Sequence, residues 1–390
     1  MLKRYDKTFW LLCVSAVFFF GGFNMVIPEL PDYVTSLGGP EFKGLVIALF
    51  TLTAMLSRPF SGKLTDTIGR KPVMIFGAAV SLVAGLIYPV IGSVAALLFL
   101  RAFHGLSTGF NPTGTAAYVA DIIPNNRRGE AMGILGLFNS IGMAIGPSVG
   151  GYISAAYGTE VLFYVSAGVA FISVIIIGNM RETMSGTQKF KPAMLKVKIS
   201  EFYEPRVLAP SITMLLTVFS FGTVLTIMPD YTTYMGFENK GVFFTVFVIS
   251  SLAIRLAAGK VSDRFGRVPV LKVSAFTVAL AMLSIGLAQN GTHLIMAAVL
   301  FGVAVGSNSP TVFAWTIDLS RKAARGKGMS TMYIALEIGI GGGALISAAL
   351  YNNKPENFQQ AFWFAGVLAF LAFLYLMIFE KKFPVEEVED

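Results

Sequence analysis

The sequence contains one short, charged segment twice. Residues 62–72 read GKLTDTIGRKP and residues 259–269 read GKVSDRFGRVP, at an offset of 197 residues. Long apolar runs flank each copy, and a charged turn between two such runs is typical of the junction between two membrane-spanning helices. The repeat therefore predicts a duplicated chain that folds within a bilayer as two related halves.

The composition agrees with a membrane location. Hydrophobic residues make up 55% of the 390 residues and charged residues only 13%, far from the balance of a soluble domain. Apolar runs of about 20 residues, the length that crosses a hydrocarbon core, occur near residues 9–30, 43–61, 73–92, 95–120, 130–153, 159–179, 208–229, 241–258, 270–288, 293–317, 328–350 and 361–379. We expect an all-α, multi-pass protein of the cell inner (cytoplasmic) membrane, with twelve transmembrane helices in two pseudo-symmetric six-helix bundles.

Basic residues predict the orientation of these spans. If the N-terminus is cytoplasmic, most of the 30 Lys and Arg residues lie inside, and those left outside are Lys43, Lys240 and Lys354. This asymmetry favours cytoplasmic positions for both termini. The net charge of +8 is then a sign of topology, and nucleic-acid binding is not expected.

The predicted organisation has four parts. They are an N-terminal six-helix bundle at 1–180, a cytoplasmic linker at 181–207, a C-terminal six-helix bundle at 208–380 and a cytoplasmic tail at 381–390. The linker is rich in lysine. A short amphipathic helix on the membrane surface near 192–203 and a solvated basic segment would both explain its composition.

The residue inventory argues against an enzyme. There is one cysteine, Cys13, there are two histidines, His104 and His293, and no P-loop is present, so neither a disulfide within the chain nor a cysteine metal site is expected. We predict no cofactor and no metal, and an ion gradient rather than ATP as the energy source. The expected partners are a small-molecule substrate, protons or Na⁺, and the bilayer, with a monomer as the default state.

Further motifs extend the repeat and carry a family resemblance. Residues 62–71 resemble the signature G-x-L-x-D-x-x-G-R-[KR], residues 142–151 resemble the antiporter signature G-x-x-x-G-P-x-x-G-G, and Gly22 with Pro28 and Pro31 resembles a first-helix pattern of exporters. Over essentially its whole length the chain resembles a major facilitator superfamily transporter of the twelve-helix drug:proton antiporter type. The resemblance implies the major facilitator fold, with a substrate site between the halves near the membrane midplane.

The repeated turns supply candidate gating residues. Asp66 lies where Arg70 and Asp121 are plausible partners, which would form a charge cluster between neighbouring helices. The counterparts in the second half are Asp263, Arg267 and Asp318. We interpret both clusters as latches that break during transport, although a role confined to folding and topology would explain the same residues.

The antiporter signature contains glycines that let a neighbouring helix approach closely, and a proline that removes one backbone hydrogen bond. A hinge and a close-packing surface are both compatible with this pattern. The residues concerned are Gly142, Gly146, Pro147, Gly150 and Gly151.

Ionisable residues within apolar runs are candidates for proton coupling, because a charge at bilayer depth is costly and normally serves a function. Arg101 and His104 resemble the signature R-x-x-Q-G, with histidine in the place of glutamine, and Glu337 lies near the middle of its run. His104 is either a proton carrier or a neutral hydrogen-bond partner. Glu29, Asp32 and Asp230 lie at outer helix ends and are expected to face water, although Glu29 could turn into the cavity.

The resemblance also implies cavity-lining residues, namely Asn24, Asn111, Tyr118, Asn308 and Trp315. Asn111 and Asn308 occupy matching places and would either clamp a substrate or join helices. The function implied is proton-coupled secondary active export of small amphipathic or cationic compounds by alternating access, that is, multidrug-type efflux. Two alternatives stay open: a narrow-substrate carrier (an exporter of a metabolite, siderophore or sugar, or a symporter), and a non-transporting sensor or lipid-handling protein.

Overall fold

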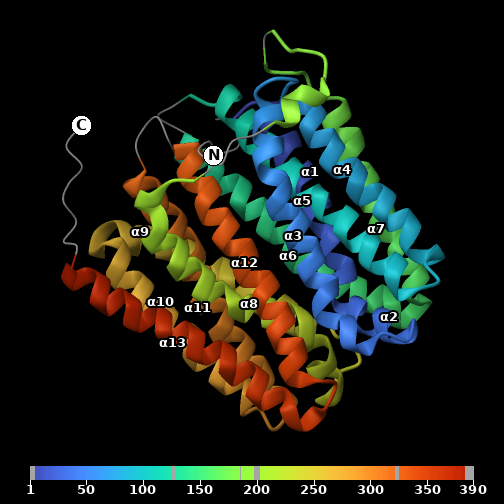
Figure 1. Cartoon of the computed structure of the whole chain (residues 1–390), viewed down its shortest axis with the longest axis vertical. Coiled ribbons are helices and arrows are strands. Elements are labelled where there is room, and N and C mark those ends of the chain that lie inside the picture. The colour runs from blue at the N-terminus through green and yellow to red at the C-terminus, as the bar shows by residue number, and fades with distance from the viewer. Residues whose placement is uncertain (1–4, 125–127, 185, 197–202, 321–324, 383–390) are drawn as a thin grey trace. The chain divides into compact units, whose positions relative to one another are not determined.

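The computed structural model describes residues 5–124, 128–184, 186–196, 203–320 and 325–382. Within these ranges the chain is helical and has no β-strand (Figure 1). The prediction of an all-α fold is therefore confirmed. Two compact units are present, the first formed by Met1–Gly38 with Leu49–Lys198 and the second by Gly39–Ala48 with Ile199–Asp390.

In the first unit, α1 packs against α6 and α7, and α4 packs against α5 and α7. Its α-helices and 3₁₀-helices are α1 (Lys7–Val26), η2 (Ile27–Glu29), α2 (Leu30–Ser36), α3 (Lys43–Thr65) from Leu49 onward, α4 (Arg70–Ile87), η4 (Tyr88–Val90), α5 (Val94–Ile122), α6 (Arg128–Tyr157), α7 (Thr159–Gly178) and η6 (Pro192–Leu195).

The second unit repeats this packing pattern. Its helix α8 packs against α12 and α13, and α10 packs against α11 and α13. The duplication read in the sequence is thus also a duplication of helix pairing. The elements are η3 (Pro40–Phe42), the start of α3, η8 (Pro205–Val207), α8 (Leu208–Tyr234), α9 (Val242–Phe265), α10 (Arg267–Gly286), α11 (Gly291–Leu319), α12 (Arg325–Tyr351), η10 (Pro355–Asn357) and α13 (Phe358–Lys382).

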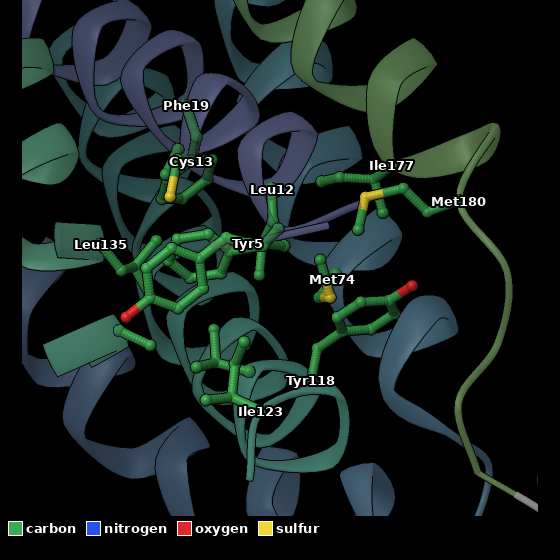
Figure 2. Packing of buried hydrophobic residues seen from close by; sticks show 14 of the residues in the cluster. Tyr5, Leu12, Cys13, Phe19, Met74, Tyr118, Ile123, Leu135, Ile177 and Met180 are labelled. Atoms are coloured by element: carbon green, nitrogen blue, oxygen red, sulfur yellow. The ribbon is translucent and has the colours of Figure 1, made fainter. Parts of the chain in front are cut away.

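The core of the first unit is built from one face of each of several helices. Leu12, Met74, Tyr118, Leu135 and Ile177 come from α1, α4, α5, α6 and α7 and pack into one buried cluster (Figure 2). On α1 the buried residues recur every three to four positions, as expected for a helix that presents one stripe to its neighbours. A similar cluster in the second unit includes Trp315 and Met332.

The first predicted run, 9–30, is broken in the structure. Helix α1 ends at Val26, a 3₁₀ turn covers Ile27–Glu29, and α2 begins at Leu30. Pro28 and Pro31 explain the break, since neither can donate a backbone hydrogen bond. In the second unit α8 continues through the single Pro229 to Tyr234, so the two halves differ here.

The number of membrane crossings is only partly supported by helix length and composition. Among the described residues, ten helices are long and apolar enough to cross a membrane, or eleven if the bent pair Val242–Arg255 and Ala257–Phe265 is one span. Helix α5 has 29 residues but is not among the ten, because polar residues within it, such as Arg101, His104 and Asn111, lower its mean hydropathy. The count of twelve spans and the orientation of the termini stay predictions.

The linker is only partly described. A 3₁₀ turn covers Pro192–Leu195, and residues 197–202 lie outside the described ranges. The choice between a surface helix and a solvated segment therefore stays open.

Candidate functional site

A buried polar network surrounds Arg101 in the first unit. Helix α5 begins after Ser93, whose hydroxyl accepts from the Ala96 amide, and places Arg101 and His104 one turn apart on the same face. Arg101 is 1% exposed. Its Nη1 donates to the Tyr88 hydroxyl at 2.9 Å, and its guanidinium carbon lies 4.5 Å from the centroid of the Phe50 ring. Both contacts stabilise a cation away from water.

The imidazole of His104 completes this network. Its Nδ1 lies 3.1 Å from the Tyr88 hydroxyl and its Nε2 lies 3.1 Å from the Ser81 hydroxyl. The Phe50 ring meets it edge to face at 5.4 Å between centroids. Ser81 and Tyr88 were not predicted from the sequence. Comparing the halves would have marked them, because at the repeat offset Ser81, Tyr88, Arg101 and His104 align with the apolar residues Val278, Ile285, Ala298 and Phe301.

Two carboxylates also lie away from solvent. Glu337 is 7% exposed, nearly halfway along α12. Glu29 is 6% exposed, on the 3₁₀ turn after α1, and accepts a hydrogen bond of 2.9 Å from the Ser154 hydroxyl of α6. The expectation that Glu29 faces water is wrong, since the proline-induced turn directs it against α6. Asp32 is exposed.

The charged turns form the clusters that their spacing predicted. Arg70 Nη1 lies 2.7 Å from Asp66 Oδ1, and Arg70 Nε lies 3.0 Å from Asp121 Oδ2. In the second unit Arg267 pairs with Asp263, and its Nε lies 2.8 Å from Asp318 Oδ2. A glycine at positive φ precedes each arginine, Gly69 at +114° and Gly266 at +88°, a conformation that other residues rarely adopt. Their role in gating stays a prediction.

Glu182 at the start of the linker binds the first of these turns. Its carboxylate accepts from the backbone amides of Arg70 and Lys71 at 3.1 and 3.0 Å, which otherwise have no partner at the start of α4. The next residue, Thr183, donates from its hydroxyl to Asp121 at 2.6 Å. The linker is thus part of the charge cluster, which its basic composition did not reveal.

Replacing Glu182 with Ala is expected to lower the free energy of unfolding by about 1 kcal/mol, because two amides at the start of α4 lose their acceptor. Thermal unfolding of the purified protein in detergent measures this change. Glu160→Ala is the matched control, since Glu160 lies in the first turn of α7 and is exposed. Equal melting temperatures for the two variants would contradict the capping role of Glu182.

The glycines of the antiporter signature face α1. An added Cβ would meet the carbonyl oxygen of Val17 at 2.5 Å from Gly142, that of Gly21 at 2.7 Å from Gly146, and that of Met25 at 2.2 Å from Gly150. Such distances require glycine at a close helix–helix contact. Pro147 and Gly151 are buried in the same continuous helix, and a hinge there stays a prediction.

The predicted cavity residues have partners within their own units. Asn24 donates to Phe20 O at 2.7 Å, Asn111 to Met74 O at 3.0 Å and Asn308 to the Thr217 hydroxyl at 2.9 Å. The Oδ1 atom of Asn308 is buried and lacks a hydrogen-bond partner among the described residues. Tyr118 packs in the core shown in Figure 2 and donates to Arg181 O, while Trp315 packs in the core of the second unit. Their place in a substrate cavity stays a prediction.

Comparison with known proteins places this arrangement in a family. The multidrug resistance protein MdtG of Salmonella arizonae is 28% identical over 385 residues, which cover 95% of this chain and 94% of that protein. MdtG of Salmonella typhi is similar to the same extent. Among solved structures, the human organic anion transporter MFSD10 (TETRAN) has a TM-score of 0.74 at 19% identity, covering 95% of this chain and all of that one.

A peptide transporter POT in complex with sulfate has a TM-score of 0.81 at 15% identity, covering 97% of this chain and 95% of that one. At 19% and 15% identity, the likeness to these two structures shows that this chain shares their fold. The model of the Major Facilitator Superfamily matches residues 12–254 and 212–390, which together span nearly the whole sequence. The chain therefore belongs to the Major Facilitator Superfamily, and it is a multi-pass membrane transporter rather than an enzyme.

Proposed function

We propose that the chain is a proton-coupled secondary active exporter of small amphipathic or cationic compounds that works by alternating access. The observation that carries the proposal is the burial of Glu337, at 7% exposure, in the middle of an apolar helix. A carboxylate at this depth is costly to keep charged and normally marks a proton or ion pathway, and either a proton or a cation can neutralise it. Competition between the two is the basis of proton antiport.

The relatives support the direction of transport. MdtG is a multidrug resistance protein by name, and this chain carries the antiporter signature on α6 in contact with α1. In the proposed cycle a proton taken up from outside neutralises Glu337 and releases a cationic cargo outward. Loss of that proton to the inside restores the charge, and the next cargo molecule can bind. The clusters at Arg70 and Arg267 would open and re-form as the cycle proceeds.

The proposal is tested by uptake of a fluorescent lipophilic cation and of an uncharged dye into proteoliposomes under an imposed pH gradient. We expect the wild type to accumulate the cation only when the gradient is present, and Glu337→Gln to fall to the level of empty liposomes, because glutamine cannot exchange a proton. Glu356→Gln is the control, since Glu356 is an exposed carboxylate of the 3₁₀ turn η10, and it should behave as the wild type.

Other outcomes contradict specific parts of the proposal. Cation uptake retained by Glu337→Gln would assign coupling to Glu29 or to the network at Arg101 and His104. If the wild type moves neither dye, a narrow-substrate carrier becomes the better interpretation. Exchange of labelled for unlabelled cation in the absence of a gradient measures cation binding and translocation apart from proton coupling. A variant that is defective only in coupling should keep this exchange.

A further inference from the structure

The phenol of Tyr88 joins the two unusual residues of α5. It accepts a hydrogen bond from Arg101 and also contacts the ring of His104. We propose that Tyr88 and Arg101 hold His104 as a neutral imidazole with its proton on Nε2. In this arrangement the histidine is a fixed hydrogen-bond partner that positions Arg101. It does not carry the proton whose coupling is proposed above.

The directions of the hydrogen bonds follow from the chemistry of the groups. An arginine guanidinium only donates, so Nη1 of Arg101 donates one of its two hydrogens to the Tyr88 oxygen at 2.9 Å. The phenol has one hydrogen left to donate, and Nδ1 of His104 lies 3.1 Å away. The same Nη1 lies 3.5 Å from Nδ1. Two donors therefore face Nδ1, and this nitrogen is the acceptor.

The second ring nitrogen takes the complementary role. A neutral imidazole has one N–H group, and with Nδ1 as acceptor that group is on Nε2. It points at the Ser81 hydroxyl, 3.1 Å away. Both nitrogens of a ring that is 1% exposed are then satisfied, as buried polar groups generally are.

A proton added to Nδ1 would disrupt this arrangement. The new N–H would face the donor groups of Arg101, placing two positive charges 3.5 Å apart at a site where water does not screen them. The titratable groups that contact the ring are Arg101 of α5 and Tyr88 of η4. Its neighbours on α3 and α4 are the uncharged Phe50 and Ser81. Among the described contacts of this ring there is no carboxylate to offset a second charge.

Tyr88 is itself held in place. Its carbonyl oxygen accepts a hydrogen bond of 2.6 Å from the Tyr33 hydroxyl, and its ring stacks on Phe163 with centroids 4.9 Å apart and planes at 25°. These contacts fix the phenol oxygen between Arg101 and His104. Tyr88 is therefore a positioning residue, and its effect on His104 can be measured apart from transport.

The chain offers a direct measurement because it contains two histidines, His104 and His293. His293 lies at the start of α11 beside Ser284. The His293→Asn variant, with ¹⁵N-labelled histidine and reconstituted in lipid nanodiscs, gives nitrogen NMR signals from His104 only. We expect one protonated and one unprotonated ring nitrogen at every pH from about 5 to 8, where a histidine in water changes charge. Signals that move to those of an imidazolium within this range would overturn the proposal.

A second variant tests the part assigned to Tyr88. In the same background Tyr88→Phe keeps the ring and removes the hydroxyl, so Nδ1 loses a donor and the two nitrogens should give exchange-averaged signals. Tyr152→Phe, at an exposed position of α6, should leave the signals unchanged. Unchanged signals in Tyr88→Phe would overturn its positioning role. If that variant does not fold, the pH series on the His293→Asn protein decides the protonation state of His104.

Transport measurements give an independent outcome. His104→Leu should lose gradient-driven cation uptake, and His104→Gln should rescue it with the pH profile of the wild type, because an amide also offers one donor and one acceptor. A shifted pH profile in His104→Gln would show that the histidine carries protons. If NMR shows a neutral His104 while the wild type moves no cation, the proposed function fails and the inference about His104 stands.

Discussion

Replacing Lys43 with Met is expected to lower the free energy of unfolding by about 3–5 kcal/mol, the usual effect of removing one partner from a buried ion pair. Lys43 Nζ forms an ion pair with Asp230 in the second unit, and the two side chains are 8% and 10% exposed. Nζ also lies 5.6 Å from the centroid of the Tyr351 ring. Without the lysine, the Asp230 carboxylate stays buried with its cationic partner removed.

A double-mutant cycle separates this pairing from a general loss of packing. Asp230→Asn should destabilise by a similar amount, and combining it with Lys43→Met should cost less than the sum of the single changes, because the double variant buries no unpaired charge. Thermal unfolding in detergent measures the stability of the two single variants and of the double variant. Lys354→Met, at an exposed position, is the control. Strictly additive single effects would contradict the ion pair.

This pair also marks a limit of sequence reasoning. Asp230 was expected to face water at an outer helix end and Lys43 to lie outside the membrane, but their side chains are only 10% and 8% exposed. The two residues are 187 positions apart in the sequence, and no local pattern connects them. Likewise, Gly44 leaves no room for a Cβ, which would lie 2.7 Å from Ala344 O. The first residues of α3 therefore belong to the second unit by packing, which a division of the sequence at its linker could not show.

Other features could be predicted because their signals are local or repeated. The apolar runs led to the all-α fold, and the repeated turns led to the contacts of Arg70 and Arg267. Arg101 and His104 were recognisable because charged and polar groups are rare in apolar runs. Ser81 and Tyr88 were missed, since serine and tyrosine are common in membrane helices and carry no signal singly. Only the structure shows that both side chains contact the imidazole of His104.

The second large effect is expected at Gly150, where alanine should lower the free energy of unfolding by about 1–3 kcal/mol. Its Cβ would lie 2.2 Å from the carbonyl oxygen of Met25, near the end of α1. This oxygen belongs to a helix backbone and cannot rotate aside as a flexible side chain can, so α1 and α6 must separate locally. The loss of close packing along this pair exceeds the gain of up to about 1 kcal/mol that alanine has over glycine within a helix.

Gly136 is the matched control because it lies in the same helix and a Cβ there would meet no atom within 4 Å. Gly136→Ala should therefore leave the melting temperature unchanged or raise it, while Gly150→Ala lowers it. Gradient-driven uptake by the same two variants decides between the two interpretations of the antiporter signature. A packing surface requires that stability and uptake fall together in Gly150→Ala. A hinge predicts normal stability with slow uptake, because added rigidity would then hinder the transport cycle and leave the fold intact.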